Sequence, residues 1–383
     1  MAKAKITPIH QVDYFLVWSF VILISLGLLM LFSASLPLSS EKTVSKGDDD
    51  SYNVNPIYYF LHQILYGLLP GIFFAYFSSR VSLDLLKKFS PLLFLCALIF
   101  LILVFIPGLG VEAGGAARWI QIGGFTFQPS EFAKLALIIY LAVLLEKKSK
   151  TKEINSFKEV AFLFLIVLAP LVLLLLLQPD MGTLVVLSFI AISMFFGTGG
   201  SFWHTGLIVL IGVCVFCVCV FFVFPYQAER VLTFLNPEED VSDSAYQINQ
   251  SLIALGSGGV LGKGFTNSIQ KWGYLPQPTA DTIFSIWGEE TGFVGSAFII
   301  LLYLIICWRG FIIAKRAPNK FSQGIVIGII SWIVIQAFFH IMAVCGLIPF
   351  TGIPLPFISY GGSAFIFNLI GMGILINVSR KTV

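Results

Sequence analysis

Charged residues are scarce in this chain, and their scarcity sets its class. Asp, Glu, Lys and Arg make up 11% of the 383 residues, whereas 57% are hydrophobic and the mean hydropathy is +0.93. Soluble domains carry about 25% charged residues. A soluble chain of this length could not bury so much apolar surface, so the composition predicts a polytopic membrane protein.

Basic patches, metal-binding motifs and a disulfide framework are also missing. A net charge of +3 without a basic face argues against nucleic acid as a partner. The six cysteines lie within or beside apolar runs, and no His or carboxylate near Cys214, Cys217 and Cys219 completes a metal site. We interpret them as small packing residues. The first apolar run, from about Tyr14 to Ser35, is long enough to span a membrane and is read as a retained helix.

Long hydrophobic runs are what the chain does have. They predict an all-α polytopic membrane protein of about ten transmembrane helices, in a single domain over residues 1–383. The predicted helices are 14–36, 57–78, 89–107, 131–146, 159–177, 182–198, 205–224, 282–308, 321–345 and 358–379. The polar segment 40–54 is expected to be a mobile loop. The segment 225–281, between the seventh and eighth helices, is too long and glycine-rich for a mere connector, and we expect it to carry part of the site.

The distribution of positive charge predicts an orientation. Most of the 23 Lys and Arg residues lie in alternate connecting segments, which the positive-inside rule assigns to the cytoplasm. Both termini are then cytoplasmic. The loops 108–130, 178–182, 225–281 and 346–357 face outward, and they hold the chemically rich residues.

Asp281 is the acidic residue that draws attention. It lies where the polar segment meets a new apolar run, and Glu289 and Glu290 follow inside that run. A carboxylate at the edge of a membrane helix is costly to hold, so it usually has a task or a partner.

A second polar cluster precedes the fourth predicted helix. Pro129 suits a helix start, and Glu131 and Lys134 then fall three apart, where they can form an ion pair. That pair fits a structural helix end and a role in substrate binding equally well. Arg118 beside Trp119 fits phosphate recognition or interfacial anchoring.

Three more features lie on the same predicted face. Asp180 is best interpreted as the cap of the next helix. The glycines of 256–264 have neither P-loop nor dinucleotide spacing, so they are expected to permit tight turns beside Gln250 and Lys263. The proline- and glycine-rich segment around Ser359 fits an anion-binding helix start or a re-entrant bend needed for packing alone.

Together these motifs resemble the SEDS family, the shape, elongation, division and sporulation proteins typified by FtsW, RodA and SpoVE. The resemblance covers nearly the whole chain. Its most specific motifs are Gln128-Pro-Ser-Glu131, Gln178-Pro-Asp180, Tyr246-Gln247 and Pro354-Leu-Pro-Phe-Ile-Ser-Tyr-Gly-Gly-Ser363. Gln270-Lys271 and Gly288-Glu-Glu290 are more similar to the FtsW branch, whereas Thr351-Gly-Ile-Pro-Leu-Pro356 is shared with the RodA branch.

The resemblance implies an activity and a set of site residues. The activity is polymerisation of lipid II into glycan strands at the outer face of the bacterial cytoplasmic membrane, during division or cell-shape maintenance. The family's essential acidic residue falls on Asp281, which becomes the candidate general base. The substrate-binding candidates are Arg118, Trp119, Glu131, Lys134, Asp180, Gln250, Lys263 and Ser359.

The expected partners are also implied by the resemblance. They are lipid II, a class B penicillin-binding protein that cross-links the product, and other membrane proteins of the divisome or elongasome. No cofactor is specified and no metal ligand is assigned, although a magnesium or manganese ion is one of the alternatives for holding the diphosphate, beside Arg118, Lys134 and Lys263.

Several positions depart from the family pattern. Gln277 and Thr279 stand where an acid and a His are usual, and Thr282 replaces an aromatic residue after Asp281. Ala117 replaces an Arg, and His340 replaces an Asn. These changes keep a third reading open, a scaffold of low activity that positions a transpeptidase.

The rival from another class is a lipid II flippase. A transporter should place polar groups along a path through the bilayer. In this sequence the chemically rich residues gather on one face, which favours an enzyme.

Overall fold

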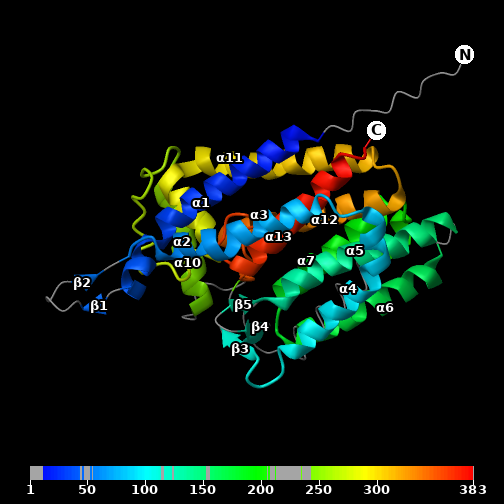
Figure 1. The fold of residues 1–383 in the computed structure, drawn as a ribbon. Helices are drawn as coiled ribbons and strands as arrows, with labels where there is room; N and C mark the ends of the chain where they lie inside the picture. Colours follow the sequence, from blue (N-terminus) through cyan, green and yellow to red (C-terminus); the bar gives the residue numbers. More distant parts are fainter. Residues whose placement is uncertain are drawn as a thin grey trace, which may run out of the picture.

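Helices dominate the computed structural model (Figure 1), which describes residues 12–43, 45–46, 52–53, 55–113, 116–122, 125–151, 156–204, 206–207, 212, 234 and 243–382. The helical elements are α1 (Tyr14–Thr43), α2 (Tyr58–Gln63), the π-helical turn η1 (Ile64–Leu68), α3 (Leu69–Ser78), α4 (Leu83–Leu103), α5 (Pro129–Lys150), α6 (Phe157–Leu177), α7 (Met181–Gly197), α10 (Asp243–Gly258), α11 (Ile283–Lys315), α12 (Lys320–Val344) and α13 (Gly362–Ser379).

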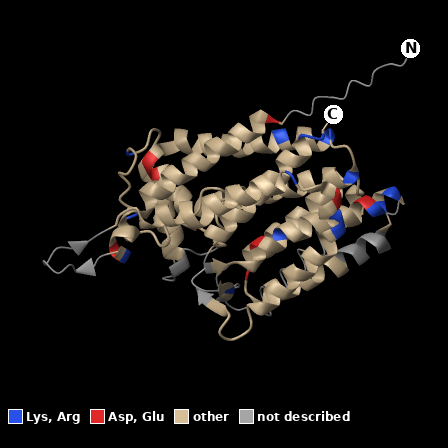
Figure 2. Cartoon of the chain, in the orientation of Figure 1, with Lys and Arg blue, Asp and Glu red and all other residues tan. Residues whose placement is uncertain are grey.

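Many of these helices have the length and composition of membrane spans. Within the described residues, six qualify, and Leu165–Leu177 and Met181–Gly197 are shorter apolar helices. Figure 2 shows charged residues mainly near the helix ends, with long uncharged stretches between them. The predicted all-α polytopic fold is confirmed. The predicted helix 205–224 lies largely outside the described residues.

Helix α12 lies at the centre of the bundle. It packs against α5, α7, α11 and α13, while α1 lies beside α11 and α3 beside α13 (Figure 1). The close approach of α12 to α5 depends on a small residue, since a methyl group at Gly328 of α12 would lie 2.6 Å from a carbon of Ile138 in α5. Trp332 of α12 is fully buried. Polar side chains on this helix are therefore held in fixed positions.

Several helices differ from their predicted bounds: α4 begins at Leu83 and α11 extends to Lys315, beyond the predicted 89–107 and 282–308. Two further differences have identifiable reasons. Helix α1 continues to Thr43, into the segment expected to be a mobile loop, because Ser39 is buried and accepts a hydrogen bond from the Tyr59 amide (3.3 Å). The second predicted helix is divided into α2, η1 and α3. Its π-helical turn lies immediately before Pro70, whose ring cannot donate a backbone hydrogen bond.

Two segments expected to be loops contain regular structure. The segment 108–130 forms a three-stranded antiparallel sheet of β3 (Gly110–Ala113), β4 (Ala116–Ile122) and β5 (Phe125–Phe127). The segment 225–281 contains α10, which buries Ala245, Ile248, Ser251 and Ala254 at a spacing of three residues. A two-stranded pair, β1 (Ser45–Lys46) and β2 (Tyr52–Asn53), follows α1.

The last predicted helix starts later than expected. Residues 351–361 are not helical, and α13 begins at Gly362. Pro354 and Pro356 lack the amide hydrogens that a helix would use, so the chain stays extended or turning here. This segment is largely buried, which brings its backbone into the polar centre of the bundle.

Candidate active site

Asp281 ends a long non-helical loop and lies just before α11. It is half-buried. The following residue, Thr282, donates its hydroxyl to the carbonyl oxygens of Pro276 (2.9 Å) and Gln277 (3.2 Å). Gln277 itself takes a φ of 48°, and its carbonyl accepts from the Ala280 amide at 3.1 Å. These bonds close a tight turn that fixes the backbone on both sides of Asp281.

The segment 351–361 supports the same turn from the other side. Ser359 donates its hydroxyl to the Ala280 carbonyl (2.7 Å) and accepts from the Leu355 amide (2.8 Å). The Tyr360 amide donates to the Thr279 carbonyl at 2.9 Å. Ser359, a predicted substrate-binding residue, is buried and thus joins the two segments. The two carbonyls that accept these bonds, those of Ala280 and Thr279, lie one and two residues before Asp281.

Gly352 brings this segment close to the Asp281 carboxylate. A methyl group at Gly352 would lie 3.4 Å from Asp281 Oδ2, and its φ is 63°, a conformation that favours glycine. The carboxylate therefore borders a bare stretch of backbone rather than a side chain at this position.

A buried polar chain connects α5 to the same segment. Lys134 donates to Glu131 Oε1 and Gln336 Oε1, both at 2.7 Å, which confirms the predicted ion pair. The ammonium also lies 5.1 Å from the ring centre of Trp332. Gln336 donates to the Pro354 carbonyl at 2.8 Å. Because an unpaired charge in this setting would be very costly, the chain fixes α5, α12 and the 351–361 segment relative to one another.

His340 contacts the segment one turn further along α12. Its Nδ1 lies 2.7 Å from the Ile353 carbonyl oxygen. A carbonyl oxygen only accepts, so Nδ1 carries the proton and Nε2 presents a lone pair. Within the described residues, four buried polar atoms around this segment have no hydrogen-bond partner: His340 Nε2, Glu131 Oε2, Asp180 Oδ2 and Thr351 Oγ1. Such atoms suit contact with water or a polar substrate.

The start of α7 packs against the 351–361 segment. Asp180 accepts from the Thr183 amide at 3.2 Å, which confirms the predicted cap. A methyl group at Gly182 would lie 2.6 Å from Ile353 Cγ1, so α7 abuts the 351–361 segment directly. Arg118 of β4 donates to the carbonyls of Gln178 (3.3 Å) and Pro179, just before the cap.

No contact joins the other predicted substrate-binding residues, Trp119, Gln250 and Lys263, to the 351–361 segment in the hydrogen bonds described above. Trp119 pairs in register with Val111, and as the strand neighbour of Arg118 it faces the opposite side of the sheet. Gln250 lies half-buried on α10. Lys263 pairs with Glu289 at 2.7 Å. Gln336 and Gly352 were not predicted, although a Gln inside an apolar membrane run is by itself a reason to expect a polar site.

The described residues do not offer a protein metal site. They contain no group of three or more His, Cys, Asp and Glu side chains that could hold a metal ion. Gln277, beside Asp281 in the turn, supplies an amide rather than a carboxylate. We therefore derive no step through a metal.

The fold and site define a class: a multi-pass membrane protein with a polar site at one end of its bundle, formed by a carboxylate and a buried non-helical segment. The family model described as "Cell cycle protein" (FtsW, RodA and SpoVE) matches residues 14–383. Stage V sporulation protein E of Bacillus subtilis is 40% identical to the chain, and the match covers 99% of each protein. A probable peptidoglycan glycosyltransferase FtsW of Geobacter sp. (strain M18) is 37% identical, over 94% of this chain and 95% of the relative.

Solved structures agree with these relatives. A chain in a structure described as "Structural coordination of polymerization and crosslinking by a peptidoglycan synthase complex" is 27% identical, with a TM-score of 0.75 over 97% of this chain and 98% of that one. The rod shape determining protein RodA of Thermus thermophilus is 26% identical, with a TM-score of 0.68 over 97% of each chain. The chain belongs to the FtsW/RodA/SpoVE family.

Proposed function

We propose that the chain is a peptidoglycan glycosyltransferase that polymerises lipid II, with Asp281 as its general base. One observation carries the catalytic assignment: Asp281 is half-buried, its carboxylate borders Gly352, and the residues just before it are hydrogen-bonded to Ser359 and Tyr360 of the 351–361 segment. The relatives named as peptidoglycan glycosyltransferases support the reaction.

The reaction joins a hydroxyl to an α-linked sugar diphosphate with inversion. It needs a base to take the hydroxyl proton, and a half-buried carboxylate with a fixed backbone suits that task. It also needs N–H donors or cations for the departing diphosphate. Lys134 and Lys263 already hold carboxylates. Arg118 uses Nε and Nη2 on carbonyls, so we assign its Nη1 to the diphosphate.

The other candidates receive roles that follow from their places. We assign Glu131, Asp180 and Ser359 to the wall of the site. Ser359 belongs to the 351–361 segment, Glu131 is linked to Pro354 through Lys134 and Gln336, and Asp180 lies two residues before Gly182, which abuts Ile353. Trp119 serves as an interfacial anchor and Gln250 contacts substrate from α10. We propose that the site faces outward from the bacterial cytoplasmic membrane and that both termini are cytoplasmic. The related synthase complex supports a class B penicillin-binding protein as the partner.

The catalytic assignment is tested with the purified chain, its transpeptidase partner and lipid II. Asp281→Asn should lower the polymerisation rate by about a hundredfold or more, because a positioned base contributes about 10²–10⁴. Asp84→Asn is the matched control, since Asp84 is an exposed carboxylate in the first turn of α4. Polymerisation by Asp281→Asn at the rate of the control would rule out this role.

A parallel assay separates the enzyme from the flippase. Vesicles containing labelled lipid II report movement between leaflets without polymerisation. An enzyme should give glycan strands without accelerating that movement, whereas a flippase should move lipid II in either variant of residue 281.

A further inference from the structure

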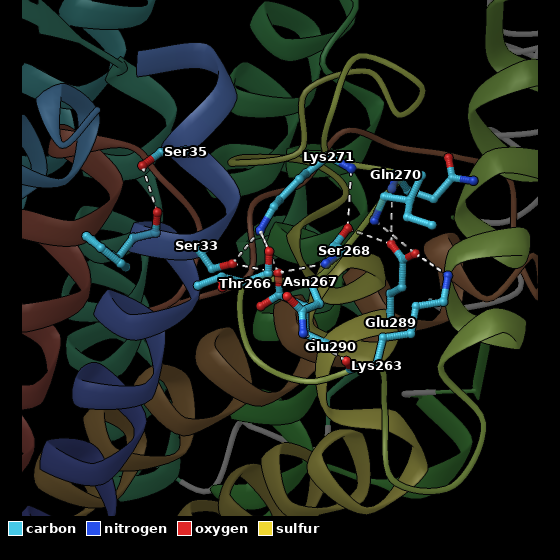
Figure 3. Close-up of polar contacts among 12 residues, drawn as sticks. Ser33, Ser35, Lys263, Thr266, Asn267, Ser268, Gln270, Lys271, Glu289 and Glu290 are labelled. Carbon is cyan, nitrogen blue, oxygen red and sulfur yellow. Dashed lines mark hydrogen bonds and ion pairs between the residues drawn. The ribbon is translucent and has the colours of Figure 1, made fainter. Parts of the chain in front are cut away.

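A second polar cluster lies at a break in α11 (Figure 3). The helix is interrupted at Gly292, which has φ 68° and ψ −162°. Glu289 and Glu290 lie just before the break and are 0% and 2% exposed. Two adjacent carboxylates inside a membrane helix are very costly unless each is paired. Both are paired, and each with a lysine of the preceding loop.

Glu289 binds the loop through side chains and backbone. Its Oε1 accepts from Lys263 Nζ (2.7 Å) and from the Ile269 amide (3.2 Å). Its Oε2 accepts from the hydroxyl of Ser268 and from the Gln270 amide (3.2 Å). Figure 3 shows this carboxylate beneath the turn 268–270, so a single side chain holds three consecutive residues.

Glu290 binds the loop to a different helix. Its Oε1 accepts from Lys271 Nζ at 2.9 Å and from the hydroxyl of Ser33 in α1. Lys271 Nζ also donates to Ser33 Oγ (2.9 Å) and to the Thr266 carbonyl (2.7 Å). All three ammonium protons are therefore used, and the lysine side chain is fully buried. The contact joins α1, α11 and the loop at one point.

The helix break itself pairs with the start of the loop. The carbonyls of Glu289 and Glu290 accept from the amides of Lys263 and Gly264, both at 3.0 Å. In return, the amide of Phe293 donates to the Gly259 carbonyl at 2.9 Å. A methyl group at Gly262 would lie 2.1 Å from the Glu290 carbonyl oxygen, so only glycine permits this approach. The loop thus satisfies backbone groups that the break would leave unpaired in a bilayer.

We propose that Glu289 and Glu290 are positioning residues that hold the loop 259–282 so that Asp281 meets its substrate in one geometry. The inference rests on the proposed function. The loop is fastened at 263–271 by the two carboxylates and at 279–280 by Ser359 and Tyr360, with Asp281 directly after the second point. Buried ion pairs add little net stability compared with apolar side chains of the same volume. The fully buried Lys271–Glu290 pair and the partly exposed Lys263–Glu289 pair on one loop are better explained by the single loop geometry that they impose.

The test compares Glu290→Gln with the unmutated chain, each with its partner in lipid nanodiscs. We expect kcat for lipid II to fall by about ten- to a hundredfold with KM nearly unchanged, because a base displaced by about 1 Å loses rate rather than affinity. Hydrogen exchange at residues 266–271 should accelerate. The matched control is Glu146→Gln, which removes a buried carboxylate that pairs with Lys87 and Lys150 in another part of the bundle. The control should lower the melting temperature and leave kcat unchanged.

A double variant separates positioning from stability. Glu290→Met with Lys271→Met replaces the pair by apolar side chains, so it should recover the melting temperature without recovering kcat. A kcat for Glu290→Gln within about twofold of the unmutated chain would overturn the proposal; so would unaltered exchange at 266–271. Normal polymerisation by Asp281→Asn would instead refute the proposed function. The hydrogen exchange of Glu290→Gln at residues 266–271 would still show whether Glu290 holds the loop, because that measurement does not depend on activity.

Discussion

At the scale of single residues, the backbone just before Asp281 is fixed by two hydrogen bonds from the 351–361 segment. Hydrogen bonds to Thr279 and Ala280 come from Tyr360 and Ser359, and each bond of this kind contributes about 1 kcal/mol. The carboxylate meets Gly352 where any other residue would place a carbon atom. We therefore expect the proposed reactivity of Asp281 to depend on a glycine some seventy residues further along the chain.

Gly352→Ala tests that dependence. The substitution should cost about 1 kcal/mol of stability because φ is positive, and it should lower the polymerisation rate because the new methyl group borders Asp281. Gly108→Ala is the control, since Gly108 also has a positive φ (88°) but no atom lies within 4 Å of the added methyl group. Melting temperatures should fall similarly in both variants, and only Gly352→Ala should lose activity. Equal activity in the two would show that the contact is unimportant.

The sequence predicted the residues of the site that depend on local patterns. The spacing of Glu131 and Lys134 correctly predicted their ion pair, and the position of Asp180 before an apolar run correctly predicted a helix cap. Gln336, His340 and Gly352 were not predicted as site residues, because their contacts join segments far apart in the sequence. Apolar periodicity is too weak in α12 to show which side faces the 351–361 segment, since the helix is buried nearly all round.

At the scale of elements, α5 and α12 are joined by a buried charged group. Lys134 is 1% exposed and bonds Glu131 and Gln336. Such a pair contributes little net stability, but breaking one side of it leaves a bare charge in the interior. The pair is thus a strong constraint on how the two helices meet.

Lys134→Met should destabilise the protein by about 3–5 kcal/mol, because Glu131 loses its countercharge. Adding Glu131→Gln should restore most of that stability. Chemical unfolding in detergent measures both effects. If Lys134 and Glu131 also shape the site, the double variant should remain less active than the unmutated chain. Full activity in a stable double variant would leave the pair a purely structural role.

Element boundaries show where sequence patterns stop being informative. Long apolar runs gave most helices within a few residues, because spanning a bilayer requires about twenty apolar residues. The sheet β3–β5 and helix α10 were missed as loops. The three-residue spacing of Ala245, Ile248, Ser251 and Ala254 is typical of a helix. The polar residues between them made α10 hard to distinguish from a loop. The break in α11 follows from contacts with the loop and has no local pattern beyond Gly292.

At the scale of the whole molecule, the two ends of the bundle differ in chemistry. The end with Asp281 carries the non-helical 351–361 segment, the sheet β3–β5 and the loop 259–282 (Figure 1). The other end carries plain ion pairs such as Arg309 with Asp13, together with most of the basic residues (Figure 2). In the proposed orientation, the proposed lipid-linked substrate reaches the end with Asp281, and we expect the proposed transpeptidase partner to act on the same side.

Labelling of single cysteines in intact cells tests this orientation. Leu261, in the loop, is 79% exposed, and Pro318 is exposed in the turn between α11 and α12. With a membrane-impermeant maleimide, Leu261→Cys should react in intact cells, whereas Pro318→Cys should react only after permeabilisation, because lysines and arginines retain that turn in the cytoplasm. The variant should be built on a chain whose six cysteines are replaced by serine or alanine, to remove background. The reverse pattern would place Asp281 on the cytoplasmic side, where precursors are made rather than polymerised, and the proposed orientation would have to be abandoned.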